Sequence, residues 1–218
     1  MEEKATADIP ESYFEYRAEF TVPMFGVWTL PNPLVSSLFL ALKGWGIGLG
    51  DITWNKEPSS YNDFQITINV LKLNAQIKFG LDSTTFIATN PDWSGAKELM
   101  ELFKAAMDVI QKAATAGISS QDVALAMHVR TGEKSSKQTM SAFVNADLLG
   151  PAQMYGISVY KEDSWFVVDK SVRYPDCFFV RLQRRHGASA SFDDIARRLY
   201  EDELKVLQML GLGNLLEG

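Results

Sequence analysis

The stretch NPDWSGAKELMELFKAAMDVIQKAATAG, from Asn90 to Gly117, decides how the rest of the chain is interpreted. Its apolar residues recur at intervals of three and four, which places them on one stripe of an α-helix. They are Ala96, Leu99, Met100, Phe103, Ala106, Met107, Ile110, Ala113 and Ala114. Asp92 is expected to cap the helix after Pro91, and Gly117 to end it in the left-handed conformation. A helix with one apolar stripe predicts a sheet for it to cover.

Alternating patterns upstream of this helix predict the strands of that sheet. The segment from Tyr16 to Val22 alternates strictly between apolar and polar residues, as a half-buried strand requires. Further strands are predicted at 51–54, 64–70, 75–79 and 84–88, and a helix at 32–44 with Asn32 as its N-cap. The first half therefore runs strand, helix, several antiparallel strands, helix.

The second half of the sequence repeats this order. A strand is predicted at 122–130, a helix at 135–146, strands at 157–160, 165–168 and 177–182, and a last helix from Ser191 to Gly211. Asp194 follows Ser191 by three residues, as in a capping box. The matching order predicts a tandem duplication of one α+β unit, strand–helix–antiparallel strands–helix, with the helices packed on one face of a curved antiparallel sheet. We expect a flexible leader at 1–13 and repeats at 14–117 and 118–218 that share one core, either as two units or as a single domain.

Composition limits the classes of protein to which the chain belongs. The 218 residues have a formal net charge of −6 and a hydrophobic content of 46%, as expected for a folded protein with a sizeable core. Cys177 is the single cysteine and has no partner for an internal disulfide. The polar N-terminus does not resemble a signal peptide, and the most apolar run, 34–50, is too short and too glycine-rich to span a membrane. We expect a cytoplasmic protein.

The chain carries no combination of residues typical of an active site. His128 lies in the polar register of a strand and His186 in a loop, and neither has a partner at metal-ligand spacing. Cys177 has no histidine near it in sequence, which favours a structural thiol. The glycines of GWGIGLG, at 44–50, alternate and precede a strand, which favours a connection over a phosphate-binding loop. We expect no metal, no cofactor and no enzymatic activity.

Two groups of residues are candidates for binding. The first is a basic cluster in an acidic protein, consisting of Arg181, Arg184, Arg185, His186, Arg197 and Arg198. The second is the polar face of the predicted sheet, where Gln65, Thr67, Asn69, His128 and Arg130 are expected to meet a partner. Arginines bind phosphate and also pair with acidic residues of proteins. The polar strand positions are also what β-propensity selects for a solvated face.

These features lead to three hypotheses for function. The leading one is a non-enzymatic interaction or assembly module, self-associating, that binds a protein partner through a sheet face or edge and the arginine cluster. The first alternative is a carrier or sensor of an apolar small molecule in a cavity between sheet and helices, since methionine and tryptophan are frequent. The second is a nucleic-acid-associated protein that uses the arginine cluster. An enzyme would require His128, His186 or Cys177 to meet a carboxylate in a common cleft.

Overall fold

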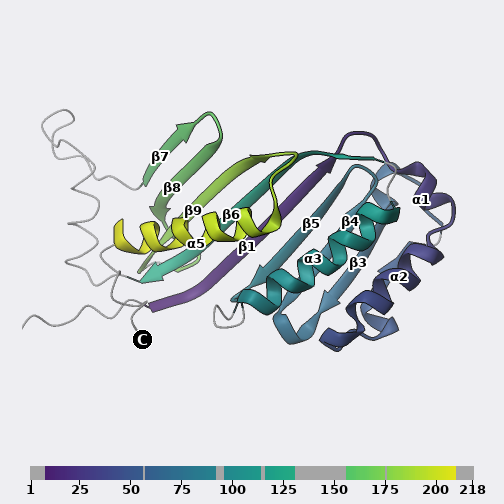
Figure 1. Cartoon of the computed structure of the whole chain (residues 1–218). Helices are drawn as coiled ribbons and strands as arrows, with labels where there is room; N and C mark the ends of the chain where they lie inside the picture. The colour runs from purple at the N-terminus through teal and green to yellow at the C-terminus, as the bar shows by residue number, and fades with distance from the viewer. Residues whose placement is uncertain are drawn as a thin grey trace, which may run out of the picture. The chain divides into compact units, whose positions relative to one another are not determined.

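The computed structural model describes residues 8–55, 57–91, 96–113, 116–130, 156–174 and 176–209. In these residues the chain is α+β, with one open antiparallel sheet of nine strands in the order β2-β3-β4-β5-β1-β6-β9-β8-β7, and four α-helices (Figure 1). The strands are β1 (Asp8–Phe20), β2 (Ile52–Trp54), β3 (Gln65–Val70), β4 (Ala75–Gly80), β5 (Ser83–Thr89), β6 (Ile118–Arg130), β7 (Gly156–Lys161), β8 (Ser164–Lys170) and β9 (Cys177–Gly187). The helices are α1 (Phe25–Thr29), α2 (Asn32–Leu42), α3 (Ala96–Ala113) and α5 (Phe192–Met209).

The chain divides into two compact units. The larger unit consists of residues 13–123 and 185–196, and the smaller unit of residues 1–12, 124–184 and 197–218. The boundaries fall inside β1, β6 and β9, so each of these strands passes from one unit into the other. Each half of the sequence therefore contributes residues to both units.

The larger unit confirms the predicted alternation. In β3 and β4 every second residue is buried, which places Ile66, Ile68 and Ile77 on the covered face. The predicted long helix is α3, and its apolar stripe packs onto the strands as expected. The ring of Phe103 stacks on Phe14 of β1 with centroids 5.5 Å apart, and it also packs against Phe86 of β5.

The predicted ends of the helices are partly wrong. Gly117 has no left-handed backbone and its carbonyl instead accepts the backbone N–H of Thr21, so α3 ends without it. Asn32 does not cap α2, because the N-cap is Pro31 and no side-chain bond caps the helix. At the start of α5 the prediction is confirmed, since Ser191 Oγ accepts the Asp194 N–H at 3.1 Å.

A buried glutamine organises the turn between β9 and α5 in the larger unit. The Gln121 carboxamide is 1% exposed and accepts the Tyr16 hydroxyl at 2.8 Å. Its Nε2 donates to the carbonyls of Gly187 and Ala190, each at 3.0 Å. The Tyr16 ring also packs against Phe192, the first residue of α5. One buried side chain of β6 thus binds backbone carbonyls of a turn that lies far away in sequence.

Several predicted features lie outside the described residues. They are the helix at 135–146, the cap at Asp92, the end of the last helix at Gly211, and the first seven residues of the expected leader. β1 already begins at Asp8, earlier than predicted. The duplication and the division at 117/118 stay predictions. Among the described helices, none combines the length and the hydropathy that crossing a bilayer would require.

Candidate functional site: an exposed strand edge and a tryptophan pocket

The structure places the six residues of the predicted basic cluster in different surroundings. In the smaller unit, Arg184 of β9 forms an ion pair with Asp202 of α5, and Arg184 Nη2 donates to Asp202 Oδ1 at 2.8 Å. The Asp202 side chain is 5% exposed, and its hydrogen bonds raise the pKa of Arg184 above its usual range. Arg184 therefore ties helix to strand.

Three further arginines of the cluster also contact acidic or aromatic side chains. Arg185 pairs with Asp122 at 3.2 Å in the larger unit. In the smaller unit, Arg197 pairs with Glu201 at 3.2 Å. The Arg181 guanidinium lies 5.6 Å from the centroid of the Trp165 ring, a cation–π contact. His186 is half-buried and Arg198 is exposed. Four of the five arginines in the cluster therefore already have an acidic or aromatic partner within the chain.

The predicted polar face of the larger unit is partly bonded within itself. Gln65 Nε2 donates to Thr67 Oγ1 at 2.8 Å, and Gln76 Nε2 donates to Asn69 Oδ1 at 2.7 Å. These side chains are half-buried and lie on the face opposite the buried isoleucines. In the smaller unit, Arg130 Nε donates to Asp176 at 2.6 Å. The sheet-face residues thus satisfy part of their own hydrogen-bonding capacity.

His128 was expected on an exposed face, and this expectation is wrong, because the residue is only 7% exposed. His128 is buried because residues of β9 and of the loop after β8 cover it, and the alternation of residues within β6 cannot predict such contacts. Tyr174 of that loop and Phe179 of β9 pack on the imidazole, with ring centroids 5.0 and 5.2 Å away. Residues 123–129 of β6 are consequently buried on both faces of the strand.

A polar cluster surrounds the imidazole within the smaller unit. Ser171 Oγ lies 2.9 Å from His128 Nδ1, and Glu11 Oε2 lies 3.9 Å from His128 Nε2. Glu11 is held by Arg173 Nη1 at 2.7 Å, and Ser171 Oγ accepts the N–H of Tyr174 at 2.9 Å. Burial lowers the pKa of His128, Arg173 acts in the same direction, and Glu11 opposes both. The imidazole is therefore neutral at neutral pH.

The order serine, histidine, carboxylate is that of a hydrolase relay, but the surroundings favour a structural role. Ser171 is 3% exposed and its hydroxyl oxygen is occupied by a backbone N–H, so a substrate carbonyl has no path to it. Cys177 is also buried, and burial raises the pKa of its thiol. This cluster could not be predicted from the sequence, because Glu11 falls in the expected leader.

Among the described residues of the smaller unit, β7 is the strand with the most exposed apolar side chains. β7 ends the strand order, and no strand of the described residues pairs with its outer side (Figure 1). Val159 is 54% exposed and Tyr160 is 73% exposed. On one face, Tyr160 stacks on Trp165 of β8 at 5.9 Å, with 8° between the ring planes. The stacking on Trp165 fixes the orientation of the exposed Tyr160 ring.

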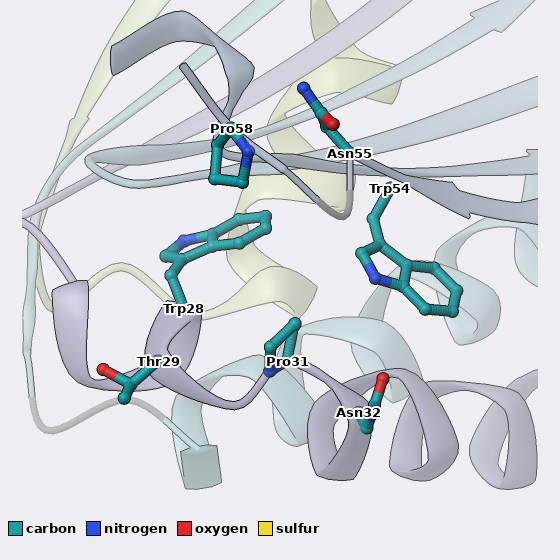
Figure 2. Close-up of a pocket in the computed structure, with 7 residues that line it drawn as sticks. All are labelled: Trp28, Thr29, Pro31, Asn32, Trp54, Asn55 and Pro58. Carbon is teal, nitrogen blue, oxygen red and sulfur yellow. The ribbon is translucent and has the colours of Figure 1, made fainter. Parts of the chain in front are cut away.

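The larger unit contains a pocket of about 450 Å³ between the α1–α2 junction and the end of β2. Figure 2 shows Trp28 and Trp54 on either side of it, with Pro31 between them and Pro58 beside the Trp28 ring. Thr29, Asn32 and Asn55 complete the lining. The sequence carries a signal for this pocket, since WTLPNP at 28–33 and WNKEP at 54–58 both bring tryptophan, proline and asparagine together.

Comparisons with known proteins add no functional assignment to this geometry. The chain matches no protein-family model, and no curated protein matches its sequence. Among the described residues, no three side chains of histidine, cysteine, aspartate or glutamate are grouped so that they would hold a metal ion. The strand edge and the tryptophan pocket are therefore the two features from which a function can be argued.

Proposed function

We propose that this protein is an interaction and assembly module that self-associates through the outer edge of β7. The observation that carries the proposal is the exposure of Val159 and Tyr160 on a strand that no described strand pairs on its outer side. Unpaired edges attract a further strand, and native proteins usually protect them with lysines, prolines or bulges. β7 has no proline, and its one lysine, Lys161, lies at the end next to the turn.

The turn between β7 and β8 determines which backbone groups face outward. Lys161 pairs with Ser164, which leaves Glu162 and Asp163 as a two-residue turn. In such a hairpin the residues that flank the turn bond to each other, and the bonded pairs recur at every second residue. Residues 161, 159 and 157 therefore bond to β8, whereas the N–H and C=O groups of residues 156, 158 and 160 point away from it.

One antiparallel register satisfies all of these outward groups when the occupant is a second copy of the chain. With Ser158 facing its own equivalent across a two-fold axis, Gly156 of each copy pairs with Tyr160 of the other. On the opposite face, Ile157 of each copy then lies against Val159 of the other, an apolar cross-strand pair. No like charges meet between residues 156 and 160.

Side chains at the two ends of β7 also suit this register. Asp169 Oδ1 lies 2.7 Å from the place where a Cβ on Gly156 would stand, so the carboxylate covers the glycine. Tyr160 of the second copy would stand beside it, with the positive edge of its ring near negative charge.

The proposal is tested by light scattering after size-exclusion chromatography, over a range of protein concentrations. The wild-type protein should form dimers. Ser158→Pro removes an outward N–H, which an edge strand tolerates, and should shift the protein to monomer. Ser158→Ala keeps the N–H and is the matched control. A wild-type protein that stays monomeric at its solubility limit, or a Ser158→Pro variant that dimerises as well as wild type, would exclude association through β7.

The predicted tandem duplication also stays a proposal, supported by strand order. β1 neighbours β5, and the strands continue outward as β4, β3 and β2. β6 neighbours β9, and the strands continue outward as β8 and β7. In both halves the first strand thus lies beside the last strand of the antiparallel run, and an 18-residue helix follows that run.

A further inference from the structure

We propose that the pocket between Trp28 and Trp54 binds a proline-rich segment of a partner protein in the polyproline II conformation. The site lies wholly within the larger unit, and the inference does not depend on association through β7. Its volume, about 450 Å³, is within the range of ligand sites, and it opens to the surface at the edge strand β2.

Trp28 forms a rigid wall of the pocket. Its ring stacks on Phe79 with centroids 5.8 Å apart and 9° between the planes, and it meets Phe64 edge-on at 5.8 Å. The residue is only 9% exposed. A wall that is already ordered loses little conformational entropy when a ligand binds, which favours affinity.

The amide groups of Asn32 and Asn55 in the lining are exposed hydrogen-bond donors. A polyproline II segment is a rich source of acceptors for them, because its backbone forms no internal hydrogen bonds and its carbonyls are all available. The indole N–H of Trp28 is buried, so Trp28 offers a ligand the surface of its ring and not its donor.

The remaining lining matches the side chains of such a segment. Trp54 and the rings of Pro31 and Pro58 offer flat apolar surfaces for proline rings, and aromatic-lined grooves are the usual sites of proline-rich recognition. None of the seven lining residues carries a formal charge, which matches an uncharged segment better than an acidic or a basic peptide. The N-terminus of α2 reaches the pocket at Asn32 without an acidic residue in its first turn.

The test measures binding of an end-blocked polyproline octapeptide to the full-length protein by isothermal titration calorimetry. A glycine–serine octapeptide is the reference, and the polyproline peptide should bind at least tenfold more tightly. Trp54→Ala should weaken binding tenfold or more. Trp45→Ala is the matched control, because Trp45 is half-buried in the same unit but does not line the pocket, and it should bind as wild type does.

A second readout covers the case in which Trp54→Ala does not fold. In NMR spectra of the wild-type protein, the indole N–H resonance of Trp54, assigned with Trp54→Phe, should shift on addition of the polyproline peptide. Equal binding of the two peptides, or a Trp54 resonance that does not move, would overturn the proposal. Binding of neutral sugars to the pocket with no response to polyproline would also overturn it and would reassign the site to carbohydrates.

Discussion

At the scale of single residues, the buried imidazole of His128 has the clearest consequence for solution behaviour. Its nearest charged groups among the described residues are Glu11 and Arg173, and Ser171 bonds to Nδ1. Burial lowers the pKa of His128 in the folded protein. Because the unfolded chain has the ordinary pKa of about 6.5, it binds the proton more readily than the folded chain does.

We predict that the free energy of unfolding falls as the pH drops below about 6.5, and that it continues to fall until the lower folded-state pKa of His128 is reached. His128→Asn should flatten this part of the profile. Urea unfolding at pH 7.5 and pH 5.5 measures the difference for wild type and variant. His186→Asn is the control for a histidine in a different environment. An unchanged pH dependence in His128→Asn would contradict the assignment.

What the sequence could predict at this scale was limited to residues whose environment is set by neighbours in the chain. Ser191 and Asp194 form their predicted cap, because the bond joins residues three apart. His128 was misplaced, because the residues that bury it come from β9 and the loop before it. Pairwise contacts over more than forty residues, such as His128 with Ser171, leave no periodic trace in a single sequence.

At the scale of elements, one ion pair joins α5 to β9 within the smaller unit. We predict that Arg184→Ala lowers the free energy of unfolding by about 3–5 kcal/mol, because it leaves the Asp202 carboxylate buried without its counter-charge. Arg197→Ala is the matched control. It removes an exposed pair on the same helix and should cost less than about 1 kcal/mol. Urea unfolding measures both, and equal losses would show that Arg184 acts only as a surface charge.

The elements themselves were the most predictable level of this structure. α3 and strands β3, β4 and β5 follow directly from the period of their apolar residues, since one face of each is covered and the other is not. α1 was not predicted. Its five residues, FGVWT, are too few to show a helical period, and Trp28 is buried by Phe79 and Phe64, which come from other elements.

At the scale of the whole molecule, the two compact units do not coincide with the two halves of the sequence. Residues 8–12 of β1 belong to the unit that contains 124–184, and residues 185–196 belong to the unit that contains 13–123. We predict that fragments 1–117 and 118–218 are unfolded when produced separately and assemble into a folded complex when produced together. Circular dichroism and co-purification measure this. A fragment that folds cooperatively without the other would contradict the prediction.

The contacts of Gln121 make folding of the larger unit depend on the order in which the chain is synthesised. Its carboxamide is the donor for two carbonyls that follow it by 66 and 69 residues, and the acceptor for Tyr16, 105 residues before it. A nascent chain therefore holds the Nε2 donor of Gln121 without its two carbonyl partners until the turn at 187–190 has been synthesised. During that interval the newly made sheet is exposed to misassembly, because this contact forms only after β9 is complete.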